Sequence, residues 1–244
     1  MKNIQNGSEQ IDKLINTKAS LMSLLVHDLK NFTLNSKSLI GLLSMSLDDE
    51  QESKLIIEKL KKNNENQNQF IQEILITFEN EHNDTKNSKK ELVALSAYLP
   101  QIAERLGSMM KTKNIKLETV FEPQNLQVYA QPKIFVEVLI NLIGNALKFS
   151  NSGQTIVLRA FILDATRIQI EVIDEGIGFD EATSDDLFLP FTPLRRRGTA
   201  QEETTGIGLH LCKTIVENHG GTVVAKSQGR GKGAVFSVVL PQEA

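Results

Sequence analysis

Residues 141–150 read Asn141-Leu-Ile-Gly-Asn145-Ala-Leu-Lys148-Phe-Ser and continue an apolar run that has helical spacing. Asn141, Asn145 and Lys148 stand at positions i, i+4 and i+7, so a helix places all three on one face. Two amides and an ammonium group on one face suit a magnesium–phosphate site, because Mg²⁺ takes few ligands from protein and more from substrate phosphates. Taken alone, the segment is equally well interpreted as a solvated polar face.

Three further segments rich in glycine follow along the chain. Asp174-Glu-Gly176-Ile-Gly178-Phe ends an apolar strand, where a carboxylate can accept a hydrogen bond from an exocyclic amine and glycine lets the backbone approach a flat ligand. Thr204-Thr205-Gly206-Ile207-Gly208-Leu209 leads into a helix, whose free N–H groups would face an anion. Gly229-Arg-Gly-Lys-Gly233 joins two strands. Taken one at a time, the three segments can also be interpreted as a strand-to-turn transition, a weak G-x-G motif and a hairpin turn. The sequence contains no P-loop motif.

The segments around these glycines alternate between strand and helix patterns. Runs rich in Val, Ile, Phe and Thr predict strands over residues 116–121, 155–163, 167–174, 221–227 and 233–240. Apolar residues at helical spacing predict helices over residues 95–113, 132–148 and 208–219. This mixture favours an α/β sandwich with a mixed sheet. The long polar stretch 180–205 reads as a functional loop, such as a lid.

The first third of the chain has a different texture. Residues 10–80 contain no proline and one glycine, and their apolar residues form two helical stripes separated by a polar break at residues 46–52. The stripes comprise Leu14, Leu21, Leu25, Leu29, Phe32, Leu39 and Leu43, and then Leu55, Leu60, Gln67, Phe70, Ile74, Leu75 and Phe78. Two long helices with a short connection predict an antiparallel hairpin. One hairpin has little core, so we expect dimerisation into a four-helix bundle, with packing against the rest of its own chain as the alternative.

His27 lies on the outer side of the first helix. It is two residues from Leu25, about 200° around the helix, and so points away from the apolar stripe. An outward histidine is ordinarily a plain surface residue. Here Asp28 can hydrogen-bond the imidazole and fix its tautomer. Asn31 is one turn on, and Lys30 can sit near an incoming phosphate.

Together, these segments resemble a known ATPase domain. Residues 90–244 are similar to the domain shared by histidine kinases, Hsp90-type chaperones, type II topoisomerases and MutL-type proteins, and the four segments look like its N, G1, G2 and G3 boxes. Leu187-Phe-Leu-Pro-Phe191 looks like the F box of the kinase branch. The resemblance implies ATP and Mg²⁺ as cofactors, with Asn145 and Asn141 at the metal, Lys148 at phosphate, Asp174 at the adenine amine and residues 180–205 as the lid. The remaining residues implied at the nucleotide are Gly176, Gly178, Phe191, Thr205, Gly206, Ile207, Gly208, Leu209 and Gly233.

The kinase branch of this family fits best. Chaperone and topoisomerase members have a water-activating Glu in the N box, where this chain has Asn141, so ATP would await another nucleophile. Arg195, Arg196 and Arg197 lie in the lid, and one of them could reach the γ-phosphate, although a solvated basic loop is the alternative. Residues 15–80 resemble the phosphoacceptor hairpin of histidine kinases. The family commonly has Pro five residues after the His, but Phe32 stands there, which predicts a straighter helix.

We therefore expect an α+β multidomain protein: a helical hairpin that forms a dimeric four-helix bundle, and an α/β sandwich of the Bergerat type with helices on one face of a mixed sheet. The expected parts are a helical lead (1–20), the hairpin (21–82), a linker (83–90) and the ATP-binding domain (91–244). The expected function is autophosphorylation of His27 and transfer to an Asp of a response regulator receiver domain. A nucleotide-gated interaction module and a phosphatase-dominant regulator, suggested by Asp28 and Asn31, remain alternatives; a serine-kinase relative is less favoured.

Composition limits the partners and the compartment. The net charge of −3 gives no basic field for nucleic acid. Cys212 is the only cysteine, which fits a reducing compartment and a small buried side chain. There is no signal peptide and no run of about 18 apolar residues, so we expect a cytoplasmic protein without a membrane segment.

Overall fold

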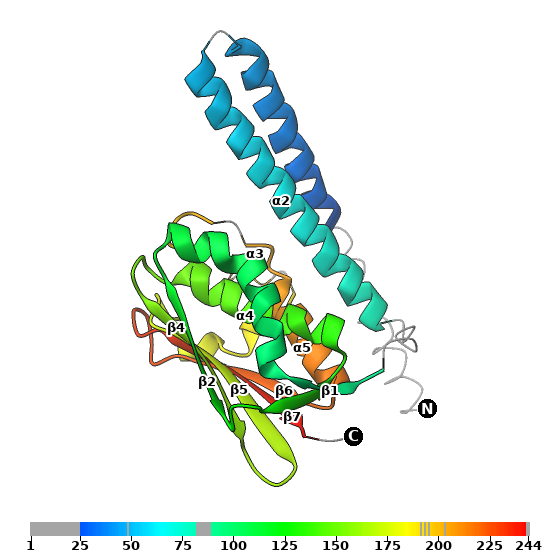
Figure 1. Ribbon diagram of the computed structural model, residues 1–244. Helices are drawn as coiled ribbons and strands as arrows, with labels where there is room; N and C mark the ends of the chain where they lie inside the picture. The colour runs from blue at the N-terminus through cyan, green and yellow to red at the C-terminus, as the bar shows by residue number, and fades with distance from the viewer. Residues whose placement is uncertain are drawn as a thin grey trace. The chain divides into compact units, whose positions relative to one another are not determined.

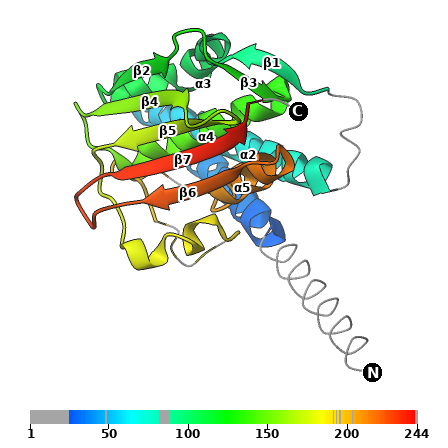
Figure 2. The ribbon, with the colours of Figure 1, turned by 90° about the horizontal axis from the view of Figure 1, so that it is seen from below.

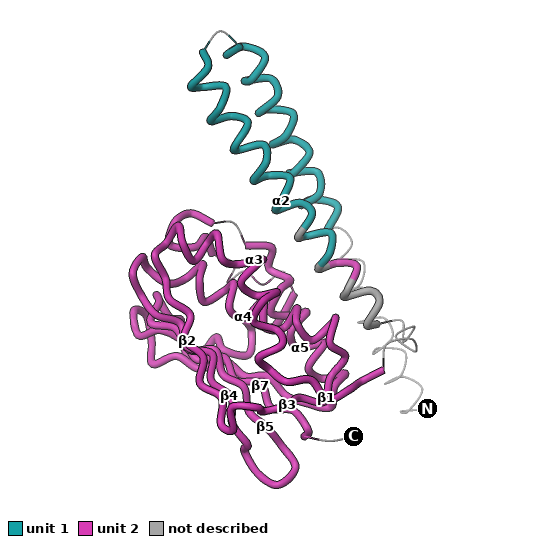
Figure 3. The backbone as a smooth tube through the Cα atoms, viewed as in Figure 1, with its two compact units in different colours: residues 1–73 teal, residues 74–244 magenta. Residues whose placement is uncertain are grey.

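The computed structural model describes residues 25–47, 49–81, 89–190, 192, 194, 196–202 and 204–242. The chain divides into two compact units, Met1–Glu73 and Ile74–Ala244 (Figure 3). The expected lead over residues 1–20 and most of the expected linker over residues 83–90 lie outside the described residues.

The first unit is a helical hairpin. Residues 25–45 are helical without interruption, and α2 (Glu50–Glu81) begins after a turn at residues 46–49 (Figure 1). Asp49 ends the turn, and its carboxylate accepts hydrogen bonds from the first backbone N–H groups of α2 at 2.9 and 3.0 Å. Such a cap satisfies donors that have no partner within the helix, so α2 starts here. The predicted hairpin is therefore confirmed.

The described core of the hairpin contains two phenylalanines and one amide. Phe32 packs on Phe70 with ring centroids 5.7 Å apart, and Ile56 is buried beside this stripe. Asn63 is also buried, and its Nδ2 donates to the Phe32 carbonyl (3.1 Å) and to Ser36 Oγ (2.8 Å). The polar middle of α2 therefore contributes to the hairpin core a buried amide whose hydrogen bonds are satisfied.

The predicted second stripe is partly wrong. Leu55 and Leu75 are exposed, whereas Ile56 is buried. Buried and half-buried residues of α2 recur at positions 53, 56, 60, 63, 67 and 70, three or four residues apart. Leu55 is one residue out of this series, which rotates it about 100° away from the core. The side chain of Phe78 lies outside the described residues.

The second unit is built on a five-stranded sheet with the order β2-β4-β5-β7-β6. β2 pairs parallel with β4, and the other neighbours pair antiparallel. Figures 1 and 2 show the α-helices of this unit on one face of the sheet. The α+β architecture with a mixed sheet and helices on one face is therefore confirmed. The strands are β2 (Lys116–Glu122), β4 (Thr155–Ile162), β5 (Arg167–Asp174), β6 (Thr222–Lys226) and β7 (Ala234–Pro241), and the helices are α3 (Leu99–Thr112), α4 (Pro132–Phe149) and α5 (Gly208–Asn218).

Two features of this unit were not predicted. β1 (Glu91–Ala94) and β3 (Gln127–Ala130) form a separate antiparallel pair. The helix expected over residues 95–113 begins as a 3-10 turn (Leu95–Tyr98), and α3 starts only at Leu99, with a proline in its first turn. Proline lacks the N–H that an inner turn needs, so it sets the start of α3.

The core of the second unit lies between the sheet and α4. Ten residues of α4 are buried, and α4 contacts β4, β5, α3 and α5. The buried residues of β4 alternate along the strand, because successive side chains of a strand point to opposite faces. This burial fixes α4 on the sheet and places the end of β5 beside the end of α4.

Candidate active site

The polar face predicted on α4 is present. Asn141, Asn145 and Lys148 are half-buried, whereas the residues between them are buried. Asn141 Nδ2 donates to the Glu137 carbonyl one turn earlier at 3.0 Å, which leaves its amide oxygen as an acceptor or ligand. The three side chains therefore share the open edge of an otherwise buried helix.

The first residue of α5 packs directly on this face. A Cβ atom at Gly208 would lie 2.5 Å from Asn141 Oδ1, so glycine lets the start of α5 approach the Asn141 amide closely. Gly206 has a φ of 76°, and Thr205 Oγ1 accepts from the Ile207 N–H at 3.4 Å. α5 has no side-chain cap hydrogen bond at its first turn. Its first N–H groups and its positive dipole end thus lie beside Asn141 and suit a phosphate.

Asp174 ends β5 beneath the end of α4. Its Oδ1 accepts from the Gly176 N–H at 2.8 Å, and the side chain is buried. Burial raises the pKa of Asp174 to about 6, although hydrogen bonds from the backbone of Gly176 and Ala234 oppose this rise. A Cβ at Gly176 would lie 2.4 Å from the Phe149 carbonyl oxygen, so glycine is needed where this loop meets α4. The result is a buried carboxylate that an amine-bearing ligand would stabilise.

The loops at residues 176–179 and 229–233 hold each other. The Gly233 N–H donates to the Gly176 carbonyl (3.0 Å), and the Gly231 N–H donates to the Ile177 carbonyl (2.7 Å). Ser227, which the sequence analysis missed, donates from Oγ to the Gly233 carbonyl (2.7 Å) and accepts from the Phe179 N–H (3.2 Å). A serine between a strand and a glycine loop is a weak signal, because such residues are common in turns.

The lid arginines differ in their surroundings. Arg196 Nη2 donates to the Gly178 carbonyl at 3.1 Å, and its guanidinium lies 5.8 Å from the centroid of the Phe149 ring. Burial, followed by the nearby charge of Arg230, lowers the pKa of Arg196. Arg196 and Arg197 are both exposed overall, and the predicted residues Arg195 and Phe191 lie outside the described residues. Of the two described candidates, Arg196 is the one in contact with the glycine loop.

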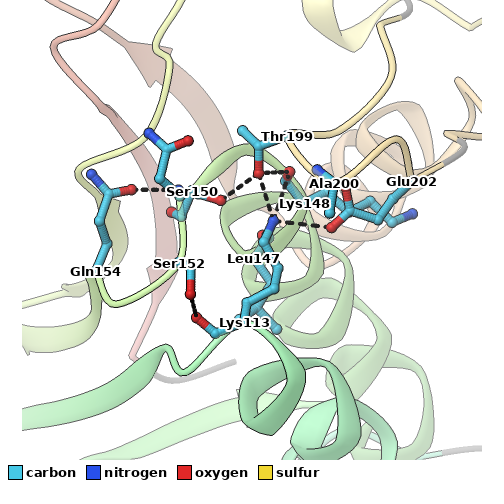
Figure 4. A network of polar contacts seen from close by, with 10 residues as sticks. Lys113, Leu147, Lys148, Ser150, Ser152, Gln154, Thr199, Ala200 and Glu202 are labelled. Atoms are coloured by element: carbon cyan, nitrogen blue, oxygen red, sulfur yellow. Dashed lines mark hydrogen bonds and ion pairs between the residues drawn. The ribbon is translucent and has the colours of Figure 1, made fainter.

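A second set of contacts near α4 was also missed (Figure 4). Lys113, just after α3, is buried, and its ammonium group donates to the Leu147 carbonyl, Thr199 Oγ1 and Glu202 Oε1 at 2.6, 2.8 and 2.9 Å. A lysine at the end of a helix gives no sequence signal of this kind, because such residues usually remain in solvent.

His27 is exposed on the hairpin, with 66% of its side-chain surface accessible. Its Nδ1 lies 3.2 Å from Asp28 Oδ1 and 3.3 Å from Asn31 Nδ2. Both contacts involve the same ring nitrogen, so Nε2 is the nitrogen available to a reagent. Lys30 is exposed on the same helix.

The donors on α4 fit a particular kind of metal site. Within the described parts of the chain, no three His, Cys, Asp or Glu residues gather to hold a metal by themselves. The amide oxygens of Asn141 and Asn145 suit Mg²⁺ that takes its other ligands from phosphates and water.

The match to a family model agrees with this geometry. Residues 130–244 match the model described as histidine kinase-, DNA gyrase B- and HSP90-like ATPase. The matched stretch runs from the last residue of β3 through α4 to the last strand, and contains all four predicted boxes.

Similar proteins cover the hairpin as well. The adaptive-response sensory kinase SasA of Crocosphaera subtropica is 25% identical over 98% of this chain and 63% of its own length. The structure of histidine kinase ThkA in complex with response regulator protein TrrA covers 91% of this chain and 61% of that chain, with a TM-score of 0.67 and 19% identity. Full-length ShkA in complex with AMPPNP covers 89% of this chain and 45% of that chain, with a TM-score of 0.62 and 18% identity.

These similarities confirm the predicted resemblance to sensor histidine kinases. At these identities the two structures carry the likeness of fold alone. The chain spans less than two thirds of the length of the curated relatives it matches. None of the described helices has the length and apolarity needed to cross a membrane.

Proposed function

We propose that this chain is the autokinase core of a sensor histidine kinase, which transfers the γ-phosphoryl group of ATP to Nε2 of His27 and then to an Asp of a response regulator. The observation that carries the proposal is the exposed imidazole of His27, whose Nδ1 is engaged by Asp28. It occurs in a chain whose other unit matches the model of an ATPase family and has no Glu at the water-activating position of the N box.

ATP would bind between the end of α4, the end of β5 and the start of α5. Asp174 accepts the adenine amine, because its buried carboxylate is otherwise poorly stabilised. The first N–H groups of α5 and Lys148 bind phosphate, and Arg196 offsets the charge that develops on the γ-phosphate. Mg²⁺, held by Asn141 and Asn145, would neutralise phosphate charge when bound.

At His27, the Nε2 lone pair attacks the γ-phosphorus while the bond to the β-phosphate oxygen breaks, so that ADP leaves. Asp28 keeps the proton on Nδ1 and holds the ring in one orientation. The phosphoryl group on Nε2 is then attacked by a receiver carboxylate, which regenerates the imidazole. A regulator partner is supported by the complex formed by ThkA, a protein of the same fold. We also propose a homodimer, because the hairpin exposes several large apolar residues, among them Val26 and Ile40.

The test uses purified protein with Mg²⁺ and [γ-³²P]ATP. We expect label that is stable in alkali and lost in acid on the wild type, and none on His27→Ala. His82→Ala serves as the matched histidine control and should retain the label. Label on His27→Ala, or no label on a wild type that binds ATP, would contradict the autokinase proposal.

A phosphatase activity toward the regulator is the second candidate, and Asn31 favours it. Its amide lies on the same exposed face as His27 and contacts the ring, where it could orient a water molecule toward an acyl phosphate. Under this proposal, Asn31→Ala slows dephosphorylation of a phosphorylated regulator, while His27→Ala does not. Equal losses in the two variants would count against it.

A further inference from the structure

Lys113 is a buried cation that links three segments far apart in sequence. Its ammonium group contacts Thr199 and Glu202 of the lid, and the carbonyls of Leu147 and Lys148 at the end of α4, the latter at 3.2 Å (Figure 4). The side chains of Lys113 and Glu202 are only 7% and 10% exposed. All the acceptors are described residues of the second unit.

The acceptors on α4 are groups that a helix leaves unsatisfied. The last carbonyls of an α-helix have no partner within it and form its negative dipole end. Lys113 satisfies two of them, and the Thr199 N–H donates to the Lys148 carbonyl at 2.8 Å. Thr199 Oγ1 also donates to the Ser150 carbonyl at 2.6 Å. The last turn of α4, which presents Lys148, is therefore bonded to the lid through its backbone.

Glu202 also forms hydrogen bonds with the lid backbone on either side of Thr199. Its second carboxylate oxygen accepts from the Ala200 N–H at 2.8 Å, and its carbonyl accepts from the Gly198 N–H at 2.9 Å. Burial alone would raise the pKa of Glu202, but the hydrogen bond from Lys113 and the backbone hydrogen bonds lower it overall. A Cβ at Gly198 would lie 2.7 Å from the Lys148 carbonyl oxygen, so the lid backbone lies directly on α4.

We infer that Lys113, Thr199 and Glu202 form a lid anchor, which fixes residues 198–202 on the end of α4 and thereby positions Lys148 and Arg196 for the ATP phosphates. Arg196 is two residues before Gly198, and its carbonyl accepts from Thr204 Oγ1 at 3.0 Å. The ion pair between Lys113 and Glu202 involves neither the Lys148 nor the Arg196 side chain. The residues of the lid anchor therefore act through other residues and are positioning residues. The inference rests on the proposed binding of ATP to this site.

Stability alone does not require an ion pair here. Replacing a buried ion pair by apolar residues of similar volume is often neutral or stabilising, whereas the geometry of a buried charge pair is strict. The lid anchor therefore predicts a selective effect: its loss weakens contacts to phosphate and leaves the adenine contact at Asp174 unchanged.

The test compares Glu202→Gln with Glu171→Gln. Glu171 is a matched control, because it is also buried in an ion pair, with Arg159 on β4 and β5. Calorimetry with Mg²⁺ measures the affinity of each variant of the 244-residue chain for ATP and for adenosine. We expect Glu202→Gln to weaken ATP binding about tenfold, the effect of losing one charge-assisted hydrogen bond. Its adenosine affinity and both affinities of Glu171→Gln should stay at the wild-type values.

Trypsin gives a readout that is independent of binding. Cleavage after Arg196 and Arg197 should be faster in Glu202→Gln than in Glu171→Gln. If Glu202→Gln does not fold, Thr199→Val, which removes one acceptor of Lys113, is measured instead. Unchanged ATP affinity, or equal losses for ATP and adenosine, would overturn the lid anchor while leaving the proposed function intact. A wild type that binds no ATP would overturn both.

Discussion

Asp174 holds a negative charge in a place that water scarcely reaches. Its pKa is about 6 in the folded protein, against an ordinary value of 3.8, because burial disfavours the carboxylate. The folded state therefore binds the proton more tightly than the unfolded state does. The protonated carboxyl contributes stability that is fully present below about pH 4 and is lost as the pH rises through about 6.

The variant Asp174→Asn tests how much stability the protein loses when Asp174 ionises, because asparagine is neutral at every pH. The free energy of unfolding of the variant should rise relative to that of the wild type between pH 4 and pH 7, by as much as about 3 kcal/mol. Urea unfolding of both proteins without nucleotide measures the difference, and changes at other groups cancel in it. A difference that stays constant over this range would mean that Asp174 is ionised as easily as in water.

The same variant separates stability from binding. Asparagine at position 174 presents an amide where the adenine amine needs a carboxylate, so we expect ATP binding to fall even if the protein becomes more stable at neutral pH. Weaker ATP binding together with higher stability would indicate that Asp174 serves ligand binding rather than the stability of the fold.

At the scale of elements, the first helix departs from the pattern that the resemblance implies at one position. Phe32 stands where the resemblance leads one to expect Pro, and the helix runs through it without interruption. The ring packs on Phe70, and the Phe32 carbonyl accepts the Asn63 amide. Here an aromatic residue serves the packing of the hairpin.

Phe32→Pro should therefore destabilise the hairpin. The variant loses one helix hydrogen bond and the contact with Phe70, and the free energy of unfolding should fall by about 3 kcal/mol or more. Thermal unfolding followed by circular dichroism measures the loss. Phe32→Leu, which keeps the backbone N–H, should lose less. An increase in labelling of His27 by the proline variant would mean that a bent helix serves the transfer better.

The hairpin also exposes an apolar side. Val26 and Ile40 on the first helix, and Ile57 and Leu75 on α2, are exposed and lie roughly a quarter turn from the core stripes. We expect this side to be buried in the proposed dimer. Ile40→Glu should raise the dimer dissociation constant at least about tenfold in sedimentation equilibrium. Leu34→Glu, exposed on the side opposite the core, should leave it unchanged; equal effects would place the interface elsewhere.

At the scale of the whole molecule, the second unit has a core of its own between the sheet and its α-helices. We expect a fragment of residues 89–244 to fold and to bind ATP with the affinity of the full chain, because a domain with its own core can fold alone. Calorimetry on the fragment measures this. The fragment should also label a second fragment of residues 1–88 added in trans, unless the covalent link is needed to bring His27 to ATP.

The sequence predicted most of this molecule where the signal was local. The predicted first and last residues of β5 were correct, and those of the other four strands of the sheet were within two residues of the observed ones. The alternation of apolar and polar residues along a strand is a local pattern, so it can be recognised in the sequence. β1 and β3 have four residues each, too few for a pattern. Leu55 and Ile56 are adjacent apolar residues, and either one fits the helical spacing of the apolar stripe of α2. The prediction that Leu55 belongs to the buried stripe was therefore wrong. Lys113 and Glu202 are 89 residues apart, and only the tertiary fold brings them together.

The Asn63 amide has a consequence for cells that contain several related kinases. It needs the Phe32 carbonyl and Ser36 Oγ at one level of the opposite helix. A helix from a paralogue without a small hydroxyl at that level would leave a buried donor unpaired, at a cost of about 1–3 kcal/mol. Swapping of helices between paralogues would thus be disfavoured from within the hairpin, which under the proposed function would help to keep one signalling pathway separate from another.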